Sequence, residues 1–328
     1  MARMRTPLLG VAVLLLVANG CSSSDSATAA PGDDAGLGAA DVAADTTPTD
    51  APTDATFGGD RPTQVRIPKG YDAAHPAPLV ILLHGYGASG KIQDLYFGLS
   101  KIADAHGFVF AAPDGTLDST GKLFWNATNA CCDFGAVPVD DVAYLSGLVR
   151  DVKAAYAIDS KRVYFVGHSN GGFMSHRLAC DKADQIAAIV SLAGAVWSDA
   201  SRCTPTEPVS VLQIHGDADA MVAYEGGSIG GDLADGGAAP IGLYPSAAQT
   251  VATWATLDGC DAALDAVAPD LDLAPSLAGA ETTVARHGNC QPGGAAELWT
   301  VRGAGHVPSF APDFAERVWG FLESHPKP

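Results

Sequence analysis

The sequence has 328 residues, of which 47% are hydrophobic, so it can form one large domain or two small ones around a substantial core. It contains 37 acidic and only 19 basic residues, which gives a formal net charge of −18. This charge disfavours binding to nucleic acid or to an anionic bilayer surface, because both would repel the protein.

The first residues have the pattern of an export signal. Two arginines precede the apolar run 8–17, which is too short to span a bilayer comfortably. The segment VANGCSSSD then resembles a bacterial lipoprotein signal, in which Cys21 becomes the lipidated first residue. We therefore expect a signal over residues 1–21 and a protein that is secreted or held at the outer surface through a lipid on Cys21. Ala18 departs from the leucine usual in such signals, so a plain secretory signal is the alternative.

Residues 22–59 are rich in Ala, Thr, Asp, Pro and Gly and contain no basic residue. Such a segment cannot bury enough apolar surface to fold, so we expect a solvated tether. The remaining residues, 60–328, are expected to form one catalytic domain, and we expect this domain to be a monomer.

Seven cysteines become six if Cys21 carries a lipid, and an even number in an exported chain suggests disulfides. We favour pairing Cys180 with Cys203 and Cys260 with Cys290, because each pair brackets one element. Cys131 and Cys132 are adjacent and are expected to be either bonded to each other or free. None of the cysteines has the spacing of a metal site.

Short apolar runs alternate with helical patterns after the tether. The runs predict strands over 78–83, 108–112, 162–166, 186–193 and 209–214. Continuous apolar runs are typical of strands that are buried on both faces in a parallel sheet. The sequence therefore predicts an α/β fold with a mostly parallel central sheet and helices on both faces, and ligands in such folds bind beyond the carboxyl ends of the strands.

Two helices and two loops are predicted between and after these strands. Apolar residues repeat at helical spacing over 142–156, with Asp140 or Asp141 placed to cap the start, and again in a last helix opened by Pro312. The stretches 226–240 and 261–279 are rich in Gly and Ala and predict long surface loops.

Ser169 lies in the sequence Gly167-His168-Ser169-Asn170-Gly171, which matches the GxSxG pattern. The pattern stands between a predicted strand and a predicted helix, as a nucleophile elbow requires. The glycines permit a turn so tight that larger side chains would collide with the backbone. The alternative is an ordinary tight turn in which the serine caps the helix.

A serine needs a base to accept its proton and a carboxylate to orient that base. His306 follows a predicted strand after a short Gly-rich loop and is our candidate base. His215 abuts a strand directly, which is more typical of a buried histidine bonded to backbone. Asp217 and Asp219 follow the same strand as His215, and either could be the acid. The chain order serine, aspartate, histidine is that of α/β-hydrolases.

The segment LLHGYGASG ends an earlier predicted strand. Its glycines allow backbone amides to face the cleft, so we assign the oxyanion hole to the amides of Tyr86 and Asn170, the latter being the residue after the nucleophile. An ordinary strand-to-helix turn would read the same way.

Several motifs together resemble the α/β-hydrolase esterases that include polyhydroxybutyrate depolymerases, feruloyl esterases and acetylxylan esterases. They are LLHGYG, VDDVAYL, GHSNGG, HGDADAMVAY and GAGH, and the resemblance covers the chain from about Arg61 to its end. It implies that Asp219, the last position of an HGxxD pattern, is the acid and that His306 closes a GxGH pattern. The chain departs from the family at His168, often Leu or Met, and at Val307, often Trp.

We therefore expect a serine esterase that uses Ser169, Asp219 and His306 and needs no metal or organic cofactor. The expected substrate is a carboxylic ester, and polymeric candidates are a feruloyl or acetyl ester of plant polysaccharide and a polyhydroxybutyrate-type polyester. Trp125 and Trp197 are candidates for lining its cleft, although a buried tryptophan is more often part of the core. A serine peptidase on the same fold and a non-catalytic surface lipoprotein are the alternatives.

Overall fold

The computed structural model describes residues 54–229 and 242–328, which all belong to one compact unit. The expected signal and most of the expected tether lie outside the described residues. Strand β1 (Ala55–Phe57) falls within the last part of that tether and pairs with β2 (Thr63–Arg66). The folded part therefore begins before Asp60, where the sequence placed its start.

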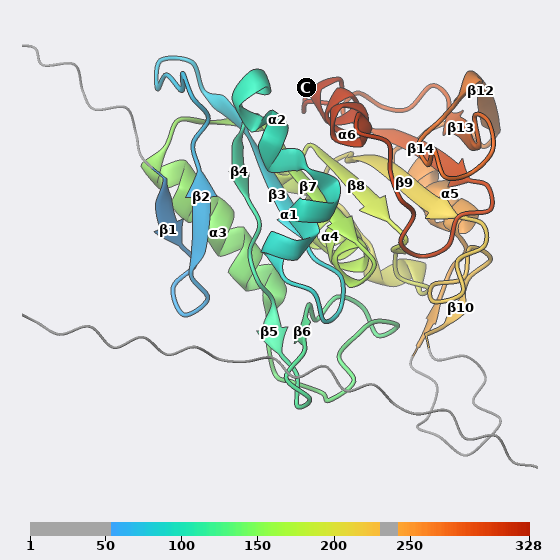
Figure 1. The fold of residues 1–328 in the computed structure, drawn as a ribbon, viewed down its shortest axis with the longest axis horizontal. Helices are drawn as coiled ribbons and strands as arrows, with labels where there is room; N and C mark the ends of the chain where they lie inside the picture. The colour runs from blue at the N-terminus through green and yellow to red at the C-terminus, as the bar shows by residue number, and fades with distance from the viewer. Residues whose placement is uncertain (1–53, 230–241) are drawn as a thin grey trace, which may run out of the picture. The chain divides into compact units, whose positions relative to one another are not determined.

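A ten-stranded sheet crosses the middle of the molecule (Figure 1). Six neighbouring strands are parallel to one another, and five of them correspond to the apolar runs of the sequence. In spatial order they are β4 (Val109–Ala111), β3 (Ala77–Leu83), β7 (Ile158–His168), β8 (Ala188–Leu192), β9 (Ser210–Gly216) and β14 (Ala295–Val301).

Antiparallel strands extend both edges of this sheet. Strands β1 and β2 lie beyond β4, and β13 (Thr282–His287) and β12 (Leu264–Leu271) lie beyond β14. The expectation of one long loop over 261–279 was therefore wrong, because residues 264–271 of this stretch form strand β12. Four short strands form two separate hairpin-like pairs: β5 (Thr116–Leu117) with β6 (Leu123–Phe124), and β10 (Gly227–Ser228) with β11 (Leu243–Tyr244).

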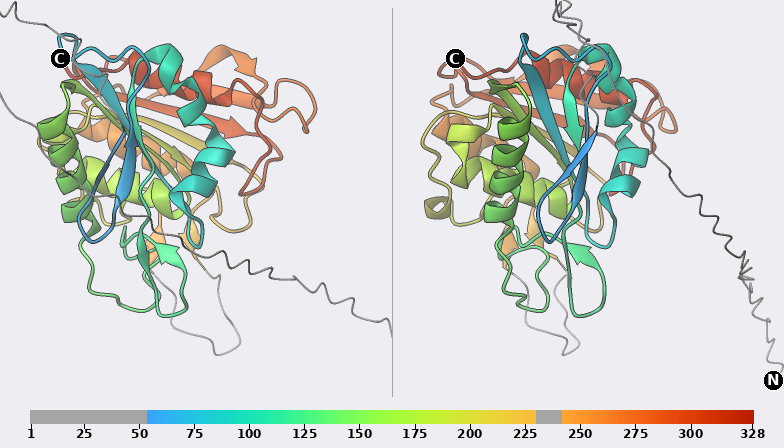
Figure 2. Two further views of the ribbon diagram at one scale, coloured as in Figure 1. Left: turned by 60° about the vertical axis from the view of Figure 1, so that its left-hand side comes forward. Right: turned by 90° about the vertical axis from the view of Figure 1, so that its left-hand side faces the viewer.

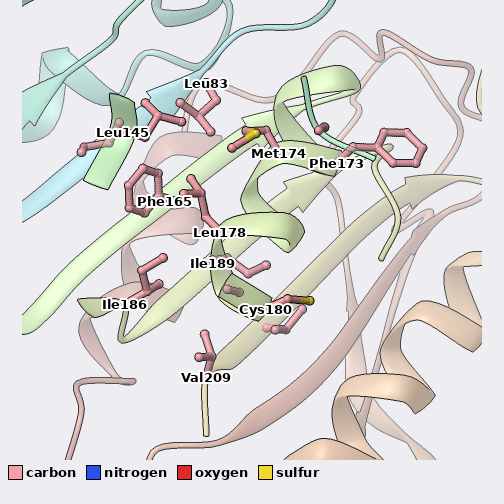
Figure 3. Close-up of a cluster of buried hydrophobic side chains, with 14 of the residues drawn as sticks. Leu83, Leu145, Phe165, Phe173, Met174, Leu178, Cys180, Ile186, Ile189 and Val209 are labelled. Carbon is pink, nitrogen blue, oxygen red and sulfur yellow. The ribbon is translucent and has the colours of Figure 1, made fainter. Parts of the chain in front are cut away.

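Helices cover both faces of the sheet, as predicted (Figure 2). The apolar side chains of α3 (Asp141–Ala155), α4 (Asn170–Asp181) and α5 (Ala247–Leu257) pack in one buried cluster. Those of α1 (Gly90–Phe97), α2 (Leu99–His106) and α6 (Phe314–Glu323) pack in the other. Figure 3 shows the first cluster, in which Met174 and Leu178 of α4 lie over Phe165 and Ile189 of the sheet. Two single-turn helices, Ala183–Gln185 and Ala200–Arg202, complete the elements.

The helix starts follow local capping chemistry. The side chain of Asp140 accepts a hydrogen bond from the amide of Ala143, so it caps α3 as expected. Helix α6 begins at Phe314 behind Asp313, two residues later than Pro312, the predicted opening residue. No helix within the described residues is long and apolar enough to cross a bilayer.

Three disulfides join the six cysteines of the folded part. Cys180 pairs with Cys203 and Cys260 pairs with Cys290, as the sequence favoured. Cys131 and Cys132 are bonded to each other, which decides between the two alternatives left open by the sequence. The Cys180–Cys203 disulfide joins the end of α4 to the segment before β9.

Candidate active site

Ser169 occupies a strained turn between β7 and α4. Its φ is 54° and its ψ is −120°, a backbone conformation that residues other than glycine rarely adopt. Its amide donates to the carbonyl of Leu192 in β8, at 2.7 Å, and its carbonyl accepts from Phe173 at 2.9 Å. These bonds hold the turn at the carboxyl end of the sheet, where ligands of α/β folds bind.

The glycines beside Ser169 are required by close backbone contacts. A Cβ at Gly167 would lie 2.1 Å from the carbonyl oxygen of Gly171, and a Cβ at Gly171 would lie 2.3 Å from the carbonyl oxygen of Leu83. No side chain can be accommodated at such distances. The helix therefore passes directly against β3 and β7, and this contact brings the start of α4 to the centre of the sheet edge.

The hydroxyl of Ser169 is not used by the fold. It does not cap α4, and it makes no hydrogen bond to any residue of the described parts of the chain. The side chain is partly exposed to solvent. The alternative interpretation of Ser169 as an ordinary helix cap therefore does not describe this turn.

Asp219 and His306 form a hydrogen-bonded pair. Asp219 follows β9 and His306 follows β14, the next strand in the sheet, so the two parallel strands deliver both side chains to one edge. Nδ1 of His306 lies 2.7 Å from Oδ2 of Asp219. Because an ionised carboxylate only accepts, Nδ1 carries the proton and Nε2 of His306 is left to accept one. Asp217 is exposed and accepts instead from the amide of Gly303, at 2.6 Å.

The carboxylate of Asp219 is buried and saturated with donors. Its Oδ1 accepts from the amides of Met221 and Val222, at 2.8 and 2.9 Å. Burial alone would raise its pKa, but the contacts with His215 and His306 and the amide of Val222 hold the pKa of Asp219 well below its usual value. Asp219 is therefore a fixed negative charge behind the imidazole of His306.

The loop that carries His306 packs against the elbow. The buried side chain of His168, which directly precedes Ser169, donates from Nε2 to the carbonyl of His306 at 3.0 Å, and the two imidazole rings lie 4.9 Å apart. Burial, with a smaller contribution from the neighbouring His306, lowers the pKa of His168 to about 4. His168 is thus a neutral anchor that ties the His306 loop to the serine turn.

The loop after β3 borders the same turn. A Cβ at Gly85 would lie 3.4 Å from the Cβ of Ser169, so the backbone of this loop passes close to the serine. The buried His84 fixes the loop by donating from Nδ1 to the carbonyl of Gly85, at 2.8 Å, and by accepting the amide of Gly115 at Nε2, at 2.9 Å. Burial lowers the pKa of His84, which keeps it in the neutral form that this pattern needs.

The side chain of Tyr86 is anchored by a hydrogen bond and a ring contact. Its hydroxyl donates to the carboxylate of Asp118, and its ring meets Phe134 edge-on at 5.1 Å. Burial and this hydrogen bond raise the pKa of Tyr86, and the same bond is the main cause of the lowered pKa of Asp118. Anchoring the side chain fixes the peptide whose amide was assigned to the oxyanion hole.

Asn170 has a structural role that the sequence did not reveal. Its fully buried amide accepts from the backbone of Trp125, at 2.6 Å, and donates to the carbonyl of the same residue, at 2.9 Å. It also reaches Sγ of Cys131, at 3.6 Å. In the sequence, this role was indicated only by a polar residue directly after Ser169 and by the adjacent cysteines 131 and 132. Trp125 and Trp197 are buried in the core, which agrees with the alternative that a buried tryptophan belongs to the core rather than to a substrate cleft.

Apolar side chains are exposed beside the candidate residues. Met221, two residues after Asp219, is 65% exposed, Val307, directly after His306, is 61% exposed, and Phe134 on the ring of Tyr86 is 48% exposed. No group of three or more His, Cys, Asp or Glu side chains within the described parts of the chain could hold a metal ion.

Comparisons with known proteins point to esterases. A family model described as Phospholipase/Carboxylesterase matches residues 140–229. The protein NocK of Nocardia uniformis subsp. tsuyamanensis, which carries the name of an esterase, is 33% identical over 56% of this chain and 52% of its own length. Feruloyl esterase B of Piromyces equi is 28% identical over 74% of this chain and 42% of its own length. The chain thus spans about half the length of these curated relatives.

Solved structures show the same fold. An acetyl xylan esterase from Aspergillus awamori superposes with a TM-score of 0.56 at 15% identity, covering 82% of this chain and 98% of its own. A thermostable esterase superposes with a TM-score of 0.55 at 15% identity, covering 84% of this chain and 63% of its own. The predicted resemblance is confirmed: the chain has the α/β-hydrolase fold and is related in sequence to feruloyl and other esterases.

Proposed function

We propose that this protein is an exported serine esterase that hydrolyses carboxylic esters through Ser169, His306 and Asp219. The observation that carries the proposal is the hydrogen-bonded Asp219–His306 pair. The His306 loop is bonded to His168, and the next residue is the strained Ser169, whose hydroxyl makes no hydrogen bond within the described residues. The names of the related proteins support the ester as the bond attacked.

The proposed reaction follows from these atoms. Nε2 of His306 accepts the proton of Ser169 as its oxygen attacks the ester carbonyl, and Asp219 stabilises the imidazolium that forms. The amides of Tyr86 and Asn170 donate to the oxyanion, the latter from the start of α4, where the helix dipole also favours negative charge. His306 then protonates the leaving alcohol, and a water molecule releases the acyl group by the reverse route.

The proposed substrate has an apolar or aromatic acyl group. Met221 and Val307 are neighbours in sequence of Asp219 and His306, and Phe134 packs on the ring of Tyr86; the apolar surface that they expose suits a feruloyl or hydroxyalkanoyl group better than a sugar. A feruloyl ester of plant polysaccharide, an acetyl ester and a polyhydroxybutyrate-type polyester are the substrates to compare. No metal or organic cofactor takes part in the proposed steps.

We also propose that the protein acts outside the cell membrane, with the signal over 1–21 and a lipid on Cys21. The three disulfides of the folded part support an oxidising compartment. In an expression host that processes lipoproteins, the wild-type protein should fractionate with membranes and incorporate labelled palmitate. Cys21→Ala should abolish both, and a soluble, unlabelled wild type would favour the plain secretory signal.

The decisive test of the function uses active-site labelling and ester turnover. A fluorophosphonate should modify Ser169 in the folded protein, as read by mass spectrometry, and p-nitrophenyl acetate and butyrate should be hydrolysed faster than a peptide anilide. Ser169→Ala should lose both properties, whereas Ser146→Ala on α3 should keep them. An unlabelled Ser169 in folded protein would favour a non-catalytic binding role, and turnover of the anilide alone would favour a peptidase.

Ester preference is then read from relative rates. We expect methyl ferulate and hydroxybutyrate oligomers to be cleaved with a higher kcat/KM than acetylated xylan, because the exposed side chains beside the site are apolar. Met221→Ser should lower the rate on methyl ferulate more than the rate on p-nitrophenyl acetate. Equal losses on both substrates would show that Met221 does not contact the acyl group.

A further inference from the structure

Four polar side chains are buried behind the candidate active site. They are Trp254 of α5, His176 of α4, and Gln213 and His215 of β9, and each is at most 1% exposed. Buried polar groups destabilise a fold unless they are hydrogen-bonded. These four side chains form a series of three hydrogen bonds, from Trp254 to His176, from His176 to Gln213 and from Gln213 to His215. The chain of bonds runs from α5 through α4 to the strand that precedes Asp219.

The first bond fixes the tautomer of His176. The indole N–H of Trp254 can only donate, and it lies 3.0 Å from Nδ1 of His176. Nδ1 therefore accepts, and the remaining proton of the imidazole is on Nε2, which donates to Oε1 of Gln213 at 3.0 Å. Burial lowers the pKa of His176 to about 4, consistent with a neutral ring that has one donor and one acceptor.

The orientation of Gln213 is fixed independently. Its Nε2 lies 2.9 Å from the carbonyl oxygen of Gly194, which can only accept. The amide nitrogen of Gln213 must therefore point to Gly194 and its amide oxygen to His176. The hydrogen bond from the indole of Trp254 to His176 leads to the same orientation, because it makes Nε2 of His176 a donor. The second N–H of Gln213 then faces Nδ1 of His215, at 3.2 Å.

The donor-to-acceptor direction of these hydrogen bonds determines whether an N–H or a lone pair of His215 faces Asp219. Because Nδ1 accepts from Gln213, the proton of His215 is on Nε2, which donates to the carbonyl of Val222 at 2.8 Å. The same Nε2 lies 3.6 Å from Oδ2 of Asp219. This separation is too long for a good hydrogen bond, but an N–H at this distance attracts the carboxylate, whereas a lone pair would repel it.

We propose that Trp254, His176, Gln213 and His215 are positioning residues for Asp219, and that their bonds hold the proton of His215 on the nitrogen that faces its carboxylate. This inference rests on the proposed role of the Asp219–His306 pair. With the His215 proton misplaced, Val222 would lose a donor and Asp219 would face a lone pair, so its carboxylate would turn away from His306.

The arrangement links the two halves of the proposed site. Helix α4 begins at the serine turn and carries His176 two turns later, while β9 carries Gln213 and His215 and leads to Asp219. A shift of α4 relative to β9 would therefore break the chain of bonds. Titratable groups near His215 include Asp219, His168, whose pKa His215 helps to lower, and the half-buried Tyr224, whose ring lies 5.6 Å away.

The direct test is the tautomeric state of the histidines. Nitrogen-15 NMR of the full-length wild type at pH 8, where an unperturbed imidazole is neutral, should show both His176 and His215 protonated on Nε2. It should also show a downfield proton for Nδ1 of His306, bonded to Asp219. A proton on Nδ1 of His215 would overturn the proposal without reference to any activity.

The variant Gln213→Met interrupts the series of hydrogen bonds, because it keeps the size of the side chain and removes its donors and its acceptor. We expect His215 to populate both tautomers, the downfield proton of His306 to move, and kcat for p-nitrophenyl acetate to fall about tenfold with KM nearly unchanged. The control is Thr250→Val on α5, a buried residue whose hydroxyl has no partner within the described residues. It should match the wild type in all three measurements.

The outcomes separate this inference from the proposed function. If Gln213→Met alters the tautomer of His215 but leaves the His306 signal and kcat as in the Thr250→Val control, the positioning role is refuted. If Gln213→Met does not fold, the wild-type tautomers still decide the polarity on which the role depends. If the wild type does not hydrolyse esters, the proposed function is refuted. The positioning role is then tested by the Nδ1 proton of His306 alone: a signal that does not move in Gln213→Met refutes it.

Discussion

Asp258 should make the stability of this protein fall with rising pH. Its carboxyl group is completely buried at the end of α5, where Oδ1 accepts from the amide of Val209 at 3.2 Å and Oδ2 has no partner among the described residues. Burial raises its pKa from 3.8 to about 7. The folded protein therefore keeps a proton that the unfolded chain releases near pH 4.

The sign and size of the effect follow from this difference. The stabilisation by protonated Asp258 is fully present below about pH 4 and is lost as the pH rises, until the folded group also ionises near pH 7. At 1.36 kcal/mol for each unit, the loss amounts to at most about 4 kcal/mol. Asp258→Asn cannot ionise, so its unfolding free energy should exceed that of the wild type increasingly between pH 4 and pH 8.

Urea denaturation of wild type and Asp258→Asn at pH 4, 5, 6, 7 and 8 measures the difference. We expect similar midpoints at pH 4 and a higher midpoint for the variant at pH 8, with equal m-values. Asp265→Asn, which changes an exposed carboxylate on β12, is the control and should follow the wild type. Parallel curves for wild type and Asp258→Asn across this range would refute the reasoning, because they would show that Asp258 titrates alike in both states.

Three further predictions concern the site and its frame. Gly171→Ala should lower the unfolding free energy by about 2 kcal/mol or more and abolish ester hydrolysis, since its Cβ would lie 2.3 Å from the carbonyl oxygen of Leu83; a stable and active variant in urea and p-nitrophenyl acetate assays would contradict this. Asp219→Asn should lower kcat roughly 10³-fold or more, whereas Asp217→Asn should stay within about twofold, and equal losses would exclude Asp219 as the orienting acid. Replacing both Cys180 and Cys203 by Ala should cost about 3 kcal/mol in urea denaturation, and an unchanged midpoint would show that this bond does not constrain the unfolded chain.

The centre of the sheet was predictable from sequence, and its edges were not. Strands β3, β8 and β9 and the second half of β7 are buried on both faces, and their sequences are therefore nearly continuous apolar runs. Strand β12 contains two aspartates and a proline in eight residues, and β13 alternates buried with less buried positions. Strand β13 is held by pairing with β14, and β12 by pairing with β13, rather than by burial of a continuous apolar run, so their composition resembles that of a loop.

The choice between the two aspartates shows what the sequence leaves open at the site. Asp217 and Asp219 both follow β9 in an acidic turn, and without the family resemblance neither could be preferred. In the structure the amides of Met221 and Val222 turn the carboxylate of Asp219 inward to His306. The carboxylate of Asp217 turns outward to the amide of Gly303. Turn geometry of this kind depends on backbone dihedral angles that no local pattern specified.

The interior hydrogen bonds were also beyond the reach of sequence patterns. His215 was correctly interpreted as a buried histidine bonded to backbone, since it donates to the carbonyl of Val222. Its link to His176 and Trp254 could not be predicted, because these residues are far apart in sequence and meet only when α4 and α5 pack on the same face of the sheet.

The conformation of Ser169 is itself an argument for function. Serine is among the best helix-capping residues, and a capping hydroxyl typically stabilises a helix by about 1 kcal/mol. At Ser169 the positive φ gives up this bond and adds strain of roughly 1–3 kcal/mol, although a glycine would avoid the strain altogether. Stability does not explain a serine at such a position, beside the loop of His306, when its hydroxyl makes no hydrogen bond within the described residues. Backbone strain that no structural hydrogen bond compensates is expected at a nucleophile that is held ready for reaction.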